Sequence, residues 1–236
     1  MIRTILAAAA LICAFAATAQ QPEKKYTEFY YQRAALFDSL GVDSADIVFL
    51  GNSLTNGGEW DELLGMPNAV NRGISGDTTE GIADRLGSIT RGKPAKIFLM
   101  AGVNDVSHDI PADSVAQSVL ALIERIHAES PSTKVYLQSL LPINNSFGRY
   151  KRVFGKEQVI RDINTILAAN AERVDATWIN LYPLFTDSEG NLRAELTNDG
   201  LHLLGPGYII WRDIIKPYVT EYYWCDKNRV SLEIIK

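Results

Sequence analysis

The chain has 236 residues, with 28 Asp and Glu against 23 Lys and Arg, and a net charge of −5. A chain of this length suits one α/β domain and can bury a sizeable core. The acidic balance argues against a surface for nucleic acid, which needs clustered basic residues. No group of cysteines and histidines has the spacing of a metal site, so we expect no metal.

The first residues, "MIRTILAAAALICAFAATAQ", differ in composition from the rest of the chain. A basic start at Arg3, an apolar stretch over 5–16 and the small residues "ATA" at 17–19 are typical of a secretory signal peptide. We therefore expect residues 1–19 to be removed before Gln20, and the protein to be periplasmic or secreted. A membrane anchor is the alternative, but the apolar stretch is shorter than the ~20 residues that span a bilayer.

Neither of the two cysteines is expected to form a disulfide within the mature chain. Cys13 lies in the predicted signal peptide, and its lipidation is the less favoured option because Ile12 is bulky. Cys225 remains alone in the aromatic-rich segment 218–230, which we expect to pack locally rather than to form an interface. Residues 20–236 should form a single domain without stable membrane insertion, and the oligomeric state stays open.

Beyond residue 20, the pattern of apolar residues predicts alternating strands and helices. Short apolar runs predict strands at 45–51, 68–74, 95–102, 134–143 and 176–185. Helical spacing, with Pro111 or capping residues at the start of some segments, predicts helices at 26–40, 75–89, 111–130, 154–174 and 205–219, and a helical turn at 60–65. This alternation predicts a parallel sheet with helices on both faces and functional groups beyond the carboxyl ends of its strands.

The polar segment "GNSLTNGG", residues 51–58, follows the first predicted strand. It is neither a GxGxxG dinucleotide pattern nor a P-loop, which needs Lys followed by Ser or Thr. Three interpretations remain open: a flavin-phosphate loop, a serine nucleophile at Ser53 on a sharp turn, or a Ser53 that only caps the following turn. Gly51, Gly57 and Gly58 would give the turn room to present Ser53.

The segment "NRGISGDTT", residues 71–79, follows the second predicted strand. Gly76 lies just before a predicted helix, where a backbone amide points outward and can donate to an anion. The alternative is a simple turn in which Asp77 and Thr78 serve as the helix cap.

The segment "AGVNDVSHD", residues 101–109, follows the third predicted strand. The side-chain amide of Asn104 can there donate to a developing oxyanion. The alternative is a turn that the side chains of Asn104 and Asp105 stabilise.

The segment "NDGLHL", residues 198–203, holds a carboxylate and a histidine three residues apart. In a turn, this spacing puts Asp199 and His202 on the same side, where the carboxylate can orient the imidazole. His127 lies within a predicted helix, which favours a solvated role, and His108 is the remaining competitor. His202 is therefore the best candidate for a general base.

The four segments together resemble the SGNH hydrolase superfamily, the GDSL-like esterases, which is named for Ser, Gly, Asn and His in four separate blocks. The matching residues are Ser53 in "GNSLT", Gly76 in "GISGDTT", Asn104 in "GVND" and His202 in "DGLH". The stretches "GDTT" and "DGLHLLGPGY" are similar to the branch of platelet-activating-factor acetylhydrolase catalytic subunits and bacterial carbohydrate or sialate O-acetylesterases. One departure is Gly-Asn-Ser in the first block, where many members have Gly-Asp-Ser.

The resemblance implies a three-layer α/β/α, flavodoxin-like fold with a central five-stranded parallel sheet. It also implies a metal-free serine esterase in which Ser53 attacks the ester, His202 transfers the proton and Asp199 orients His202. The backbone amides of Ser53 and Gly76 and the side chain of Asn104 would hold the oxyanion. A flavin site has no further support in the chain, so we expect no cofactor.

The predicted export and the resemblance favour a small-molecule or glycan ester with a short acyl group, above all acetyl. A lysophospholipase or thioesterase-type acylhydrolase is the alternative enzyme, and an inactive carbohydrate-binding relative is the alternative outside the enzymes. The joint presence of Ser53, Asp199 and His202 argues against the binding protein, which has no need of all three.

Overall fold

The computed structural model describes the backbone of residues 24–233 and the side chains of residues 24–220. The predicted signal peptide with Cys13 lies outside these residues, and so do the side chains of Cys225 and most of segment 218–230. Within the described part, no helix has both the length and the apolar character needed to cross a membrane.

Five parallel strands form one sheet in the order β2-β1-β3-β4-β5. The strands are β1 (Ile47–Gly51), β2 (Ala69–Gly73), β3 (Lys96–Met100), β4 (Lys134–Gln138) and β5 (Ala176–Ile179). This is the flavodoxin-like order, in which the direction of winding reverses between β1 and β3. Both of these strands are buried at every residue, which explains the apolar runs at 47–50 and 97–100.

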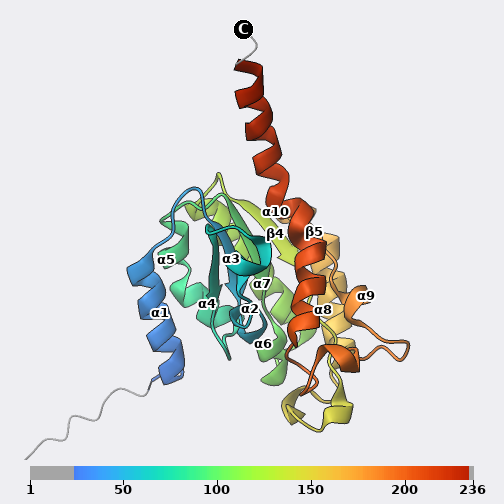
Figure 1. Cartoon of the computed structure of the whole chain (residues 1–236). Helices are drawn as coiled ribbons and strands as arrows, with labels where there is room; N and C mark the ends of the chain where they lie inside the picture. The colour runs from blue at the N-terminus through green and yellow to red at the C-terminus, as the bar shows by residue number, and fades with distance from the viewer. Residues whose placement is uncertain (1–23, 234–236) are drawn as a thin grey trace, which may run out of the picture.

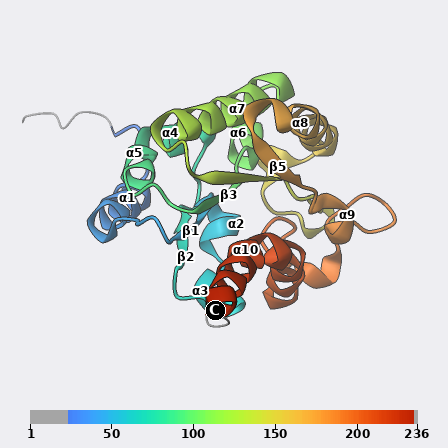
Figure 2. The same cartoon turned by 90° about the horizontal axis from the view of Figure 1, so that it is seen from above.

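Helices cover both faces of the sheet (Figure 1), and Figure 2 shows this arrangement from above. One face carries α4 (Thr79–Arg85), α7 (Ala112–Glu129) and α8 (Glu157–Asn170), and the other carries α3 (Trp60–Leu64) and α10 (Gly205–Glu233). The first helix, α1 (Glu28–Leu40), contacts the short α5 (Gly87–Thr90). The predicted three-layer α/β/α architecture is confirmed.

Several predicted elements differ from the structure in extent. The strand expected over 176–185 ends at Ile179 and its last residues form the short helix α9 (Tyr182–Phe185), and the helix expected over 205–219 continues to Glu233. The helix expected over 75–89 is split into α4 and α5, because the last turn of α4 tightens and the helix restarts at Gly87. The strand expected over 134–143 ends at Gln138. Beyond it, the backbone N–H and C=O of Leu140 bond the side-chain amide of Asn164 instead of a neighbouring strand.

A row of stacked aromatic rings crosses the face of the sheet beneath α3 and α10. Phe49 of β1 and Phe98 of β3 are in register, and their ring centroids lie 5.0 Å apart. Trp60 of α3 stacks on Phe49 at 4.1 Å, and Trp211 of α10 meets Trp60 edge-on. These buried rings carry a large part of the apolar contact area and fix α3 and α10 over the sheet.

The remaining helices are short and lie in the connections. They are α2 (Ser53–Asn56), α6 (Val103–Ser107), α9 (Tyr182–Phe185) and the 3₁₀ turns η1 (Asn145–Phe147), η2 (Lys151–Val153), η3 (Glu172–Val174) and η4 (Ala194–Leu196). Two of them, α2 and α6, directly follow β1 and β3. The candidate site is built around these two.

Candidate active site

The sheet order brings the predicted polar segments together at one edge. Ser53 follows β1, Gly76 follows β2 and Asn104 follows β3, and β1 lies between the other two strands. Ligands of open parallel sheets bind outside the carboxyl ends of the strands where the winding direction reverses. Asp199 and His202 reach the same edge from the loop that precedes α10.

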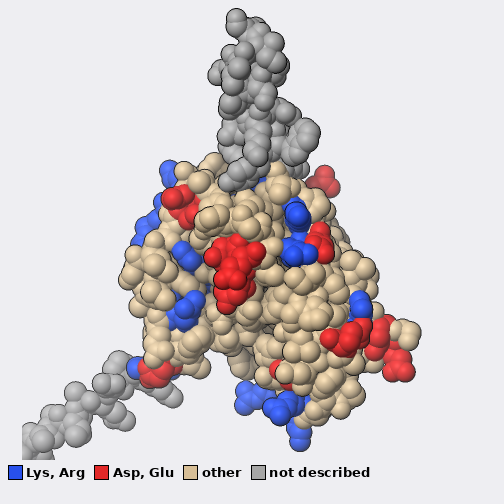
Figure 3. Space-filling model, viewed as in Figure 1, with Lys and Arg blue, Asp and Glu red and all other residues tan. Residues whose placement is uncertain are grey.

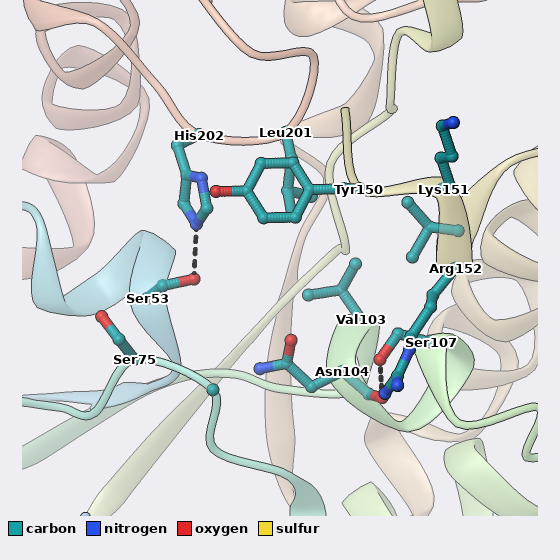
Figure 4. A pocket seen from close by; sticks show the side chains of 12 residues that line it. Ser53, Ser75, Val103, Asn104, Ser107, Tyr150, Lys151, Arg152, Leu201 and His202 are labelled. Carbon is teal, nitrogen blue, oxygen red and sulfur yellow. Dashed lines mark hydrogen bonds between the residues drawn. The ribbon is translucent and has the colours of Figure 1, made fainter. Parts of the chain in front are cut away.

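Ser53 is the first residue of α2, but it does not cap this helix. Asn52 is the cap, and its Oδ1 accepts a hydrogen bond from the Leu54 amide at 3.1 Å. The interpretation of Ser53 as only a helix cap is therefore wrong. Its hydroxyl lies instead 2.9 Å from Nε2 of His202, a residue 149 positions away in the chain (Figure 4).

Close backbone approach holds the Ser53 turn against the next strand. A Cβ atom at Gly51 would lie 2.4 Å from the carbonyl oxygen of Met100, so this position accepts no side chain. Two aromatic side chains secure α2 from the other side: Tyr208 donates to the Leu54 carbonyl and Trp60 to the Thr55 carbonyl, both at 2.9 Å.

Asp199 and His202 form a compact turn, as their spacing predicts. Oδ2 of Asp199 lies 2.8 Å from Nδ1 of His202, and its Oδ1 accepts the backbone amides of His202 and Leu201 at 2.8 and 2.9 Å. Gly200 between them adopts φ 86°, and a Cβ there would lie 2.1 Å from the carbonyl oxygen of Asn144. The turn thus depends on a glycine at this position.

The ionisation of Asp199 determines which ring nitrogen of His202 carries the proton. Burial opposes the charged form, but the hydrogen bonds from His202 and Leu201 outweigh it and hold the pKa of Asp199 below its usual value. An ionised carboxylate can only accept, so the hydrogen between the two residues belongs to Nδ1. In neutral His202, Nε2 is then the acceptor for the Ser53 hydroxyl.

Three hydrogen-bond donors lie around Ser53. The Ser53 amide opens α2, so it has no partner within the helix, and the Gly76 amide bonds no group in the described residues. Gly76 has φ 82°, which turns the chain just before α4. Nδ2 of Asn104 donates to the carbonyl of Asp77 at 2.8 Å, and its second hydrogen is left for a ligand.

A buried ion pair fixes the Gly76 loop to the end of β1. Nε of Arg85 lies 2.8 Å from Oδ2 of Asp77, and Nη2 of Arg85 donates to the Gly51 carbonyl at 3.2 Å. Burial raises the pKa of Asp77 to about 6, although the Arg85 charge acts in the opposite direction. The Thr78 side chain caps α4, so the expected cap is confirmed for Thr78, whereas Asp77 forms the ion pair.

Asp105 links the Asn104 segment to the same loop. Its carboxylate accepts the backbone amide of Thr79 at 3.1 Å and the Thr79 hydroxyl at 2.5 Å. Asp105 and Thr79 are both buried. The sequence predicted that Asp105 could stabilise its own turn. In the structure its carboxylate joins two loops, which holds Asn104 beside Gly76.

A pocket of about 480 Å³ opens next to Ser53 and His202 (Figure 4). Gly76, Asn104 and Ser75 line the side that carries Ser53, and Val103 and Leu201 supply apolar surface. The opposite wall comes from the connection after β4 and consists of residues 150–153.

The opposite wall was missed by reasoning from the sequence. Tyr150 directs its ring edge at His202, with ring centroids 5.0 Å apart and an interplanar angle of 72°. Burial and the nearby Asp199 carboxylate raise the pKa of the Tyr150 phenol. The position of this segment beyond the carboxyl end of β4 was the one available signal.

The other two histidines lie away from Ser53. His108 lines a neighbouring cavity beside Tyr30 and Thr78. Nε2 of His127, near the end of α7, contacts the Asp175 carbonyl at 3.1 Å on the surface. The predicted solvated role of His127 fits this position, and His202 is the histidine that the fold brings to Ser53.

A serine, a histidine and a carboxylate joined in this order on an α/β fold are the arrangement of serine hydrolases, the class that includes the carboxylic ester hydrolases. The model of the GDSL-like Lipase/Acylhydrolase family matches residues 49–210, more than half of the chain. The chain belongs to this family and is an acylhydrolase. All four predicted segments lie within the matched residues.

Relatives and solved structures agree with the family. The chain is 28% identical over 169 residues to platelet-activating factor acetylhydrolase IB subunit alpha2 of Homo sapiens, covering 69% of this chain and 71% of that protein. A Streptococcus pneumonia structure described by reference to platelet-activating factor is 28% identical, with a TM-score of 0.74 over 81% of this chain and 92% of its own. A GDSL-like lipase of Bacteroides thetaiotaomicron is 26% identical, with a TM-score of 0.72 over 83% and 100%.

Proposed function

We propose that this chain is a serine esterase that removes short acyl groups, above all acetyl, from small-molecule or carbohydrate esters through an acyl-enzyme intermediate. The observation that carries the proposal is the continuous hydrogen-bonded series from Ser53 through His202 to Asp199, next to three donors on one pocket. Such a series provides a nucleophile, a general base and a group that orients the base.

In the first half of the reaction, Ser53 Oγ attacks the ester carbonyl carbon and its proton passes to Nε2 of His202. The carbonyl oxygen becomes negative and is held by the amides of Ser53 and Gly76 and by Asn104. Asp199 stabilises the resulting imidazolium. The bond to the alcohol oxygen then breaks, and the alcohol leaves with the proton from Nε2.

In the second half, water takes the place of the alcohol. His202 Nε2 removes one proton from the water as its oxygen attacks the acyl carbon. The bond to Ser53 Oγ breaks, and the proton on Nε2 returns to Ser53. The products are the carboxylic acid and the free enzyme, so atoms and charges balance over the cycle.

The choice of an acetyl group draws on the relatives and on the shape of the site. A 28% identical relative is named as an acetylhydrolase. Most of the pocket surface is apolar, and side chains such as Val103, Val153 and Leu201 give the methyl of an acetyl group an apolar contact. The volume of about 480 Å³ must also hold the alcohol half of the ester, which leaves little room for a long acyl chain.

Comparing 4-nitrophenyl acetate with 4-nitrophenyl octanoate and palmitate tests the acyl preference. We expect kcat/KM to be highest for acetate and to fall with chain length. A preference for the long chains would contradict the acetyl proposal and favour a lysophospholipase. Release of acetate from an acetylated xylan and from an O-acetylated sialic acid, measured by chromatography, then separates the two sugar classes.

We also propose that residues 1–19 direct export and are absent from the mature protein. The support is the pattern of charge and apolar residues in this segment. Amino-terminal sequencing of protein recovered from the periplasm or the medium should begin at Gln20. Recovery in the cytoplasm with Met1 retained would contradict this part of the proposal.

A further inference from the structure

The pocket wall opposite Ser53 is basic, although the chain as a whole is acidic. Lys151 and Arg152 line this wall, and no Asp or Glu is among the described residues that line the pocket. Arg149 lies next to them in the chain but outside the lining. Figure 3 shows basic side chains gathered at the lower end of the molecule, where Figure 1 places the connection between β4 and α8.

These cations have no partners of opposite charge that would neutralise them. Arg149, Lys151 and Arg152 are exposed, and none forms an ion pair with a described residue. Asp109 lies close enough to Arg152 for the two charges to interact, but its direct partner is Lys156, at 2.8 Å. Asp199 on the remaining side is occupied by His202. A ligand anion would therefore meet free positive charge on this wall.

The two lining cations differ in direction. Figure 4 shows the side chain of Arg152 extending along the wall toward Ser107, whereas the ammonium group of Lys151 points away from Ser53 toward the rim. A guanidinium presents several N–H donors in one plane, which suits a carboxylate or phosphate better than a single ammonium does. Arg152 is the stronger candidate for contact with a ligand.

We infer that Arg152, assisted by Lys151, binds an anionic group on the alcohol half of the ester. The inference rests on the proposed acetylesterase function, because an acetyl group ends at its methyl and leaves the rest of the pocket to the alcohol. His202 must protonate the leaving oxygen, and Tyr150, two residues before Arg152, contacts the His202 ring. The alcohol thus leaves along the wall that carries the two cations.

Two acetyl esters that differ in charge test this inference: 4-acetoxybenzoate, which is anionic, and 4-acetoxybenzamide, which is neutral and of similar size. The wild-type enzyme should have the higher kcat/KM for the anionic ester. The substitution Arg152→Gln should lower the ratio of the two kcat/KM values about three- to fivefold, the upper end of what an exposed ion pair contributes, through KM of the anionic ester. Arg152→Lys should restore part of the ratio.

Arg149→Gln is the matched control, because it removes the same charge from the same segment without altering the pocket lining. It should change the ratio far less than Arg152→Gln does. Raising the salt concentration should lower the ratio in the wild-type enzyme and hardly affect it in Arg152→Gln.

Three results would overturn the inference: no preference for the anionic ester, an equal loss on both esters in Arg152→Gln, or an equal effect of Arg149→Gln. 4-Nitrophenyl hydrogen succinate carries its negative charge on the acyl half, and 4-nitrophenyl butyrate is its neutral counterpart. If the enzyme prefers the succinate but shows no preference for 4-acetoxybenzoate, the anion is bound on the acyl half, and this result also overturns the inference. Hydrolysis of neutral 4-acetoxybenzamide reports on the proposed function separately. If wild-type enzyme cleaves neither acetyl ester, the proposed function fails and this inference fails with it.

Discussion

The two walls of the active-site pocket are built differently. The wall around Ser53 comes from loops at the ends of three adjacent strands, and buried polar contacts such as Arg85 with Asp77 and Asp105 with Thr79 hold it. The wall of residues 150–153 belongs to a connection without strand structure, is exposed over most of its length, and begins at Tyr150 with φ 53°. We therefore expect the reaction to depend on the rigid wall, and the choice of alcohol to depend on the exposed wall.

Removing the nucleophile from the rigid wall should have the largest effect. Ser53→Ala should lower kcat for acetyl esters on the order of 10⁴-fold or more, because the acyl-enzyme can no longer form. A steady-state assay with 4-nitrophenyl acetate and covalent labelling by an organophosphonate measure this. Ser75→Ala is the matched control, since Ser75 lines the same pocket but its hydroxyl contacts Asn56. Hydrolysis that persists in Ser53→Ala would contradict the mechanism.

Removing a donor from the same wall should have the next largest effect. Asn104→Ala should lower kcat on the order of 10²–10³-fold with a small change in KM, because the amide acts on charge that develops in the transition state. Asn56→Ala is the control, since the Asn56 amide also ties two loops of this wall, through the Gly73 carbonyl, but does not line the pocket. Equal losses in the two variants would show that loosening of the wall, and not a missing donor, is the cause.

The strands and the residues at their ends could be predicted because their causes are local. Strands buried on both faces need continuous apolar runs, as at 47–50 and 97–100, and the chain must turn polar where it leaves the sheet. Asp199 and His202 are three residues apart, so their pairing was visible as well. The bond between Ser53 and His202 spans 149 positions and followed from the family resemblance and the predicted parallel sheet.

The missed features depend on contacts that residue type alone does not reveal. Asn52 and Ser53 are both good helix caps, and only the folded backbone shows that Asn52 caps α2. No periodic pattern marks Tyr150, and a tyrosine is an unusual residue for a left-handed conformation. The basic wall was hidden because the pocket that makes Arg152 relevant exists only in the folded chain.

The Asp199 turn, which joins the two walls, should make stability depend on pH. The folded pKa of Asp199 lies below its value in the unfolded chain, so its charge stabilises the fold above about pH 4 and this contribution is lost as the pH falls further. Asp199→Asn should therefore be less stable than wild type at pH 6, by about 1 kcal/mol. Urea unfolding at several pH values measures this, and the difference between the two proteins should shrink below about pH 4. A difference independent of pH would show that the charge is irrelevant.

The smallest effect is expected on the exposed wall, at Tyr150. A non-glycine residue with φ 53° and ψ 45° is strained, and asparagine tolerates this conformation better than tyrosine. Tyr150→Asn should therefore keep the unfolding free energy or raise it by up to about 1 kcal/mol. It should at the same time lower activity several-fold, because His202 loses the ring that limits its movement. Urea unfolding and a steady-state assay measure the two quantities.

Two controls separate strain from function at this position. Lys93 has a similar left-handed φ of 50° but lies before β3, at the opposite end of the strands from the pocket, so Lys93→Asn should relieve strain without a change in activity. Tyr150→Phe keeps the ring and the strain and removes only the hydroxyl, whose pKa burial and the Asp199 carboxylate raise. If Tyr150→Asn loses more than about 1 kcal/mol of stability, the ring is needed for folding. The packing of the Tyr150 ring would then outweigh the strain in its backbone. The exposed wall would contribute to the stability of the fold as the rigid wall does.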